Sequence, residues 1–149
     1  MIGSQHSLSG LSGAVAEFIR AMDSVRKSIG TDVGLSANEL RAMARVAESD
    51  GLTPKALAES LELTTGAVTA ISTRLVARGL LVRVEQTHDR RSLLLHLTDA
   101  GHAVMERTYR QFQEALAAAA IPLENADQAS LIRSLTTMTG ELRNRPGSG

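Results

Sequence analysis

Helix-start signals follow one another closely in the middle of the chain, and they limit the folds that it can adopt. Ser36 and Glu39 have the spacing of a capping box, in which two side chains satisfy the first free backbone N–H groups of a helix. Thr53 precedes a proline, whose fixed φ suits the first helical position. A third signal lies at Thr64 or Thr65. The spacing predicts three short helices joined by tight turns.

The third of these helices is followed by a predicted β-hairpin. Val68, Ile71 and Leu75 share one helix face, and Gly79 suits the left-handed residue after a helix end. Two β-rich runs, "LLVRVE" and "SLLLHL", then flank a polar loop. Helix, turn, helix and hairpin in this order is the plan of a winged helix-turn-helix, whose second short helix enters the DNA major groove. We therefore expect a DNA-binding lobe at residues 36–97, with a recognition helix at about 65–78 and a wing at about 85–92.

Long amphipathic helices flank this lobe. Apolar residues recur at steps of three and four from Leu8 to Ile29, and Gly30 is expected to end that helix. A second helix is expected to start at Thr98 and to stop near Pro122, and a third to run from about 124 to 143. Such helices must pack on one another or on another chain. We expect a homodimer with its interface at Leu11, Val15, Leu131, Leu135, Met138 and Leu142.

Length and composition fit one globular domain. With 149 residues, the chain is expected to form a single domain, mainly α with a small β-hairpin wing. The dimerisation helices would be residues 8–30 and 98–143. The chain has no cysteine, no apolar run long enough to span a bilayer and no secretory signal at its start. We therefore expect a cytoplasmic protein with no membrane partner.

The charge pattern favours DNA only locally. The net charge is zero, so no diffuse attraction to nucleic acid is implied. From Leu63 to Leu97, however, five arginines stand against two acidic residues. The side of the recognition helix opposite its apolar face is small and uncharged, whereas a solvated helix more often carries Glu, Lys and Gln there. That side consists of Gly66, Thr69, Ala70, Thr73 and Ala77.

Two segments, "LELTTGAVTAISTRLVARGLLVR" and "DRRSLLLHLTDAG", resemble the MarR family of bacterial transcription regulators, and the resemblance extends over nearly the whole chain. It implies a homodimeric repressor that binds a pseudo-palindromic operator in double-stranded DNA. By resemblance, Asp89 would hold the wing through an ion pair, and Arg90 or Arg91 would meet phosphate or support the wing. We expect the DNA-binding residues to be Thr64, Thr65, Gly66, Thr69, Ala70, Thr73, Arg74, His88, Arg90 and Arg91.

The resemblance also implies a small phenolic or lipophilic effector, bound where the lobe meets the dimerisation helices. Phe18, Met22, Met105 and Tyr109 could line such a pocket, although apolar residues at helical spacing are normally core residues. No cofactor and no metal are expected.

Two departures from the family pattern remove positive charge. Family wings often carry an arginine at the tip, where this chain has His88. A basic residue often follows the threonine of the recognition helix, where this chain has Ala70. Operator affinity could be modest, or groove contacts could lie elsewhere.

Two other function classes are weighed against DNA binding. An enzyme would have to use the four histidines, and His96 and His102 could approach each other near Asp99 and Glu106. No His-x-x-x-His pair, nucleophile elbow or phosphate-binding glycine loop is present, and we expect no enzymatic activity. A winged-helix module that binds protein instead of DNA is the second alternative, because this fold alone does not determine function.

Overall fold

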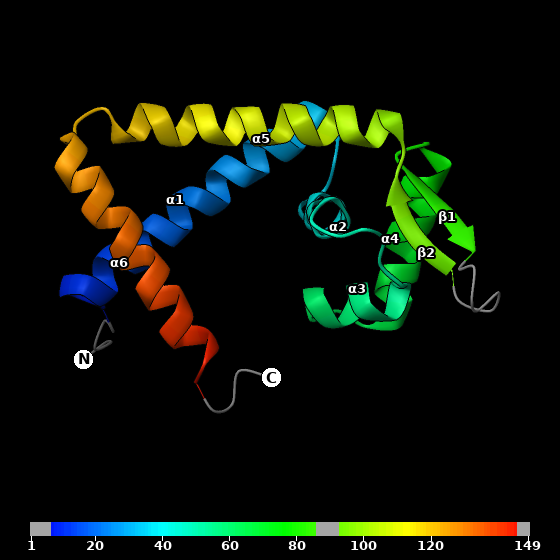
Figure 1. Ribbon diagram of the computed structural model, residues 1–149, viewed down its shortest axis with the longest axis horizontal. Helices are drawn as coiled ribbons and strands as arrows, with labels where there is room; N and C mark the ends of the chain where they lie inside the picture. The colour runs from blue at the N-terminus through cyan, green and yellow to red at the C-terminus, as the bar shows by residue number, and fades with distance from the viewer. Residues whose placement is uncertain (1–6, 86–92, 146–149) are drawn as a thin grey trace, which may run out of the picture. The chain divides into compact units, whose positions relative to one another are not determined.

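The computed structural model describes residues 7–85 and 93–145. Its elements, shown in Figure 1, are α1 (Gly10–Val33), α2 (Ala37–Ala47), α3 (Pro54–Leu61), α4 (Thr65–Ala77), β1 (Leu81–Glu85), β2 (Leu93–Leu97), α5 (Asp99–Ala120) and α6 (Asn125–Arg143). The prediction of a mainly helical fold with one β-hairpin is confirmed. The chain divides into two compact units, residues 1–112 and residues 113–149, and the extent of a single domain stays a prediction.

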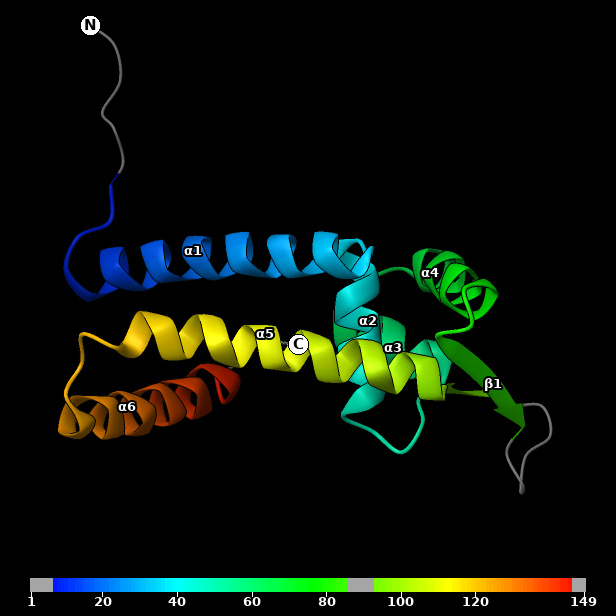
Figure 2. The same cartoon turned by 90° about the horizontal axis from the view of Figure 1, so that it is seen from above.

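Three short helices and the hairpin form the centre of the first unit. α2, α3 and α4 contact one another, α2 contacts β2, and α4 contacts β1; Figures 1 and 2 show these elements side by side. Their shared core includes Met43, Leu57, Val68, Leu75 and Leu95, which are fully buried. Burying each large apolar side chain contributes about 1.5–3 kcal/mol. This core fixes α4 against the rest of the lobe.

The helix-start signals act as the sequence predicts. Ser36 Oγ accepts the Glu39 backbone N–H at 3.3 Å, and the Glu39 carboxylate accepts the Ser36 N–H at 2.9 Å, which completes the capping box. Thr53 Oγ1 accepts a backbone N–H at the start of α3 at 3.1 Å. Thr64 Oγ1 does the same for α4 at 3.2 Å, so Thr64 is the capping residue and Thr65 is the first residue of the helix.

The hairpin pairs β1 with β2 in antiparallel register, from Leu81 opposite Leu97 to Glu85 opposite Leu93. A further bridge joins it to the connection between α2 and α3. The Leu52 N–H donates to the Leu95 carbonyl at 3.2 Å, and the Leu95 N–H donates back at 2.8 Å. The base of the hairpin is therefore held in the lobe on both sides of β2.

The predicted end of the first helix is wrong. Gly30 does not end α1, which continues to Val33; the left-handed residue after the helix is Gly34, with φ 68°. Gly30 is buried, and a Cβ there would lie 2.8 Å from the Leu35 carbonyl oxygen. The glycine is required by a close approach of the backbone. Sequence spacing cannot distinguish this requirement from a helix stop. The helix also begins at Gly10, two residues later than Leu8.

In the second unit, α6 buries none of its residues. Leu131 and Leu135 are 46% and 44% exposed, and Met138 is half-buried. Gln128 Nε2 donates to the Leu123 carbonyl at 3.1 Å, which ties the start of α6 to the preceding turn. Much of the apolar surface of α6 is therefore exposed in the single chain.

No helix in the described ranges combines the length and the apolar composition needed to cross a membrane.

Replacing Gly30 with Ala should destabilise the protein. The new Cβ would press on a backbone oxygen, which cannot swing aside, and overpacking of this kind costs roughly 1–3 kcal/mol. Gly140, a helical residue of α6 with open space around its Cα, is the matched control, and alanine there should stabilise by roughly 0.5–1 kcal/mol. Urea unfolding of both variants at equal protein concentration measures the difference. Equal stabilities would show that the junction after α1 yields to the added methyl group.

Candidate nucleic-acid interface

The helix α4 presents two opposite faces. Val68, Ile71 and Leu75 are buried in the lobe, with exposed fractions of 0%, 4% and 0%. The outward face is exposed and carries no ionisable side chain; it consists of Gly66, Thr69, Ala70, Thr73 and Ala77. Thr64 and Thr65 are also exposed, at the N-terminal end of the same helix. The structure thus brings these predicted DNA-binding residues together on one accessible helix.

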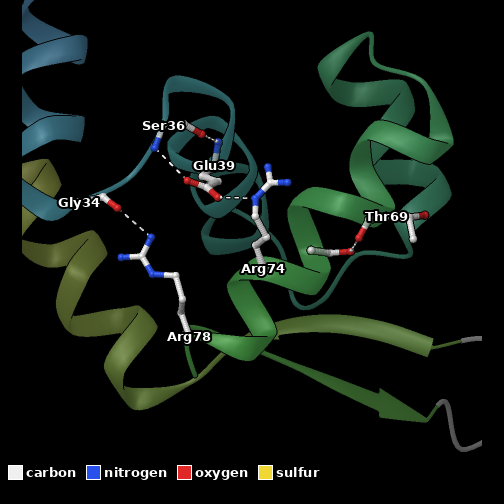
Figure 3. Close-up of polar contacts among 7 residues, drawn as sticks. Gly34, Ser36, Glu39, Thr69, Arg74 and Arg78 are labelled. Carbon is white, nitrogen blue, oxygen red and sulfur yellow. Dashed lines mark hydrogen bonds and ion pairs between the residues drawn. The ribbon is translucent and has the colours of Figure 1, made fainter.

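The two threonines of the outward face have different hydrogen-bonding states. Thr69 Oγ1 donates its proton to the Thr65 carbonyl within the helix, at 2.8 Å (Figure 3). Its oxygen can therefore accept a further hydrogen bond but has no proton to donate. Thr73 Oγ1 instead accepts a hydrogen bond from Arg83 Nη2 of β1, at 3.1 Å. The Thr73 hydroxyl keeps its own proton for another acceptor.

Arg74 faces α2. Its Nε donates to Glu39 Oε1 at 3.0 Å, while the other Glu39 oxygen accepts the Ser36 N–H of the capping box (Figure 3). The Glu39 side chain is 10% exposed and that of Arg74 is 56% exposed. The hydrogen bond from the Ser36 backbone lowers the pKa of Glu39 below its ordinary value; burial opposes this shift, and Arg74 adds to it. The predicted DNA contact Arg74 is thus engaged in an ion pair within the lobe.

Arg78, one turn after Arg74, also contacts the lobe. Its Nη1 donates to the Gly34 carbonyl at 2.8 Å, at the end of α1 (Figure 3). Together the two arginines attach the last turns of α4 to the junction between α1 and α2. Both arginines therefore hold the C-terminal end of α4 against the lobe, and both guanidinium groups make hydrogen bonds within it.

The predicted wing falls largely outside the described residues. Glu85 is the last residue of β1. His88, Asp89, Arg90 and Arg91 lie outside the described ranges, so their roles stay predictions.

Sequence reasoning missed three contacts of this surface. Arg83 and Arg78 had been counted only as local charge, and Glu39 only as a capping residue. Their partners lie 10, 44 and 35 residues away along the chain, at Thr73, Gly34 and Arg74. The alternation along β1 could have pointed to Arg83, since it shares a strand face with buried Leu81.

A cleft of about 990 Å³ lies between α1, α2 and the first part of α5. Met105 and Tyr109, two of the four predicted ligand contacts, line it; Phe18 and Met22 do not. Burial raises the pKa of Tyr109, and the nearby Glu48 charge adds to the effect. The cleft wall includes Thr108, whose buried hydroxyl has no hydrogen-bond partner among the described residues.

The histidine-based metal site that was weighed above finds no support in the geometry. Within residues 7–85 and 93–145, no group of three or more His, Asp or Glu side chains is placed to hold a metal ion.

Replacing Glu39 with Gln should lower the free energy of unfolding at pH 7. Hydrogen bonds to a charged group contribute roughly 1.5–3 kcal/mol, and exposure of Arg74 favours the lower end. Because the folded-state pKa of Glu39 is depressed, its contribution is present above the ordinary value of 4.5 and is lost as pH falls through the folded value. Urea unfolding from pH 7 to pH 3 should show the two proteins converging. Glu59→Gln, at an exposed position of α3, controls for loss of a carboxylate. A gap between wild type and Glu39→Gln that is independent of pH would contradict the prediction.

The fold of the chain is shared with solved structures. A point mutant of MarR from E. coli is 21% identical, with a TM-score of 0.76 over 90% of this chain and 99% of that chain. A point mutant of MepR from S. aureus is 19% identical, with a TM-score of 0.78 over 90% and 99%. Another MepR mutant, bound to an oligodeoxyribonucleotide, is 19% identical, with a TM-score of 0.67 over 91% and 99%. These likenesses establish the fold.

The sequence comparisons concern a shorter part of the chain. No curated protein matches it. The MarR family model matches residues 35–93, which run from the start of α2 into β2 and include the whole of α4. Over these residues the chain is therefore similar to the MarR family.

Proposed function

We propose that the chain is a cytoplasmic repressor that binds a pseudo-palindromic operator as a homodimer and leaves it when a small phenolic or lipophilic molecule binds. The observation that carries the proposal is the outward face of α4, which is exposed, small and uncharged. Long charged side chains would keep a helix away from a surface, whereas Gly, Ala and Thr let its backbone approach. A recognition helix needs this close approach to reach base edges in the major groove.

Different residues would serve affinity and sequence choice. Phosphate contacts position a protein on DNA, and base contacts specify the sequence. We assign Thr69 and Thr73, at the middle of the outward face, to base contacts. Thr64 and Thr65, at the N-terminal end of α4, suit the DNA backbone. Arg90 and Arg91 are assigned to phosphate on the sequence alone.

The homodimer is supported by apolar side chains that a lone chain leaves in water. In α6, Leu131 and Leu135 are about half exposed and Ile132 is 65% exposed. In α1, Leu11 is 68% exposed. A second copy of the chain would cover such surfaces, and two-fold symmetry would present two copies of α4 to two half-sites about one helical turn apart, roughly 34 Å.

The cleft between α1, α2 and α5 supports the effector part of the proposal. Its size lies in the range of small-molecule sites, and Met105, Tyr109 and Phe112 give it an apolar and aromatic wall. Ser36, Leu35 and Thr31 line it from the junction that Arg74 and Arg78 attach to α4. A molecule that displaces this junction would move the recognition helix.

Binding to random duplex DNA at low salt, with a steep loss as salt is added, tests the DNA part of the proposal. Each neutralised phosphate contributes about 0.9 to the slope of log affinity against log salt, because counterions are released. Fluorescence anisotropy between 50 and 300 mM salt measures that slope. Selection of bound sequences from a random pool then identifies the operator. Absence of DNA binding would favour the alternative, a winged-helix module that binds protein.

Replacing Leu135 with Asp should leave each chain folded but abolish the dimer and operator binding. Leu135 is exposed in the single chain, so the charge is harmless there, but burying it in an interface costs several kcal/mol. Thr137→Asp adds the same charge at an exposed position on the other side of α6. Analytical ultracentrifugation and operator titration would report both effects. A monomeric Leu135→Asp protein that binds the operator normally would contradict the homodimer.

A further inference from the structure

The outward face of α4 lacks a positive charge of its own. The two arginines of the helix end, Arg74 and Arg78, donate to Glu39 and to the Gly34 carbonyl and so contact the lobe. The family position that often carries a basic residue holds Ala70. In the part of the chain that the structure describes, a positive charge reaches the outward face from a different element, the strand β1.

That charge is Arg83. Side chains alternate along a strand, so Arg83 shares the face of buried Leu81, and its cross-strand neighbour is buried Leu95. The strand β1 contacts α4. The Arg83 side chain is exposed, and its Nη2 donates to Thr73 Oγ1 at 3.1 Å. The strand thus places a guanidinium beside the middle of the outward face.

The hydrogen bond leaves a defined set of donors. Thr73 accepts from Arg83, so its hydroxyl proton is free to donate, and Arg83 retains its remaining N–H groups. Adjacent donors match the two acceptors, N7 and O6, that guanine presents in the major groove. Thr69 differs, because its proton is already given to the Thr65 carbonyl. The donor character is therefore specific to the Thr73 end of the face.

We propose that Arg83 is a specificity-determining residue of the DNA interface and that it reads, together with Thr73, a guanine in each operator half-site. The inference rests on the proposed DNA binding. A phosphate contact would need only the charge of Arg83, whereas a guanine contact needs its planar fork and the adjacent hydroxyl.

The test is selection of bound duplexes from a random pool, followed by titration of the best operator. Wild type, Arg83→Lys, Arg83→Ala, Thr73→Val and Arg107→Ala are compared. Arg83→Lys keeps the charge and loses the fork, and Thr73→Val keeps the shape and loses the hydroxyl. Arg107→Ala removes an exposed arginine of α5 as the charge control. Both altered side chains of the pair are exposed, so all variants should keep the wild-type melting temperature within a few degrees.

We expect wild type to enrich a guanine at one position of each half-site. Arg83→Lys and Thr73→Val should lose about tenfold or more of the preference for that guanine, while Arg107→Ala keeps it. Replacing the guanine by 7-deazaguanine, which lacks the N7 acceptor, should weaken wild type by a similar factor and leave Arg83→Lys nearly unaffected.

Two results would overturn the inference. If Arg83→Lys and Thr73→Val select the same sequences as wild type, neither side chain reads a base. If Arg83→Ala weakens operator and random DNA equally, Arg83 binds phosphate only. Failure of wild type to bind any duplex is a distinct outcome, since it overturns the proposed function as well.

Discussion

The carboxylate of Glu39 joins the first turn of α2 to α4. One of its oxygens completes the capping box with Ser36, and the other accepts from Arg74 of α4. A carboxylate this deeply buried is stable only while charged partners and N–H donors surround it. The same carboxylate therefore caps the start of α2 and helps to fix the orientation of α4. Arg78 adds a second attachment at Gly34, so the orientation of α4 is set at the junction that also borders the cleft.

Local signals made much of the fold predictable. The capping residues Ser36, Thr53 and Thr64 and the hairpin act over a few residues, and the structure confirms each of them. The features that sequence reasoning missed depend on contacts between distant segments. Gly30 was mistaken for a helix stop because its role depends on a carbonyl oxygen beyond the helix end. Arg83 could be counted but not placed, since its partner belongs to another element.

The helix α4 and the strand β1 contribute different groups to the candidate interface. The outward face of α4 supplies small side chains and hydroxyl groups. Within the described residues, Arg83 of β1 supplies a positive charge beside that face. The arginines of α4 itself hold the helix in place. A helix that carries no charge toward the groove gains little from long-range attraction, so discrimination between sequences would depend on short-range fit more than on electrostatic steering.

The exposed surface of α6 would make the state of the chain depend on the protein concentration. α6 buries none of its side chains, and most of the stability of a helix in a protein comes from packing of its apolar face. Its ordering would then be linked by mass action to the association of chains, and would rise with protein concentration. In the proposed homodimer, DNA binding would therefore weaken at low protein concentration, because the association that orders α6 would also bring the two copies of α4 together. The rate at which the chain is synthesised would then determine when enough of it has accumulated to bind DNA.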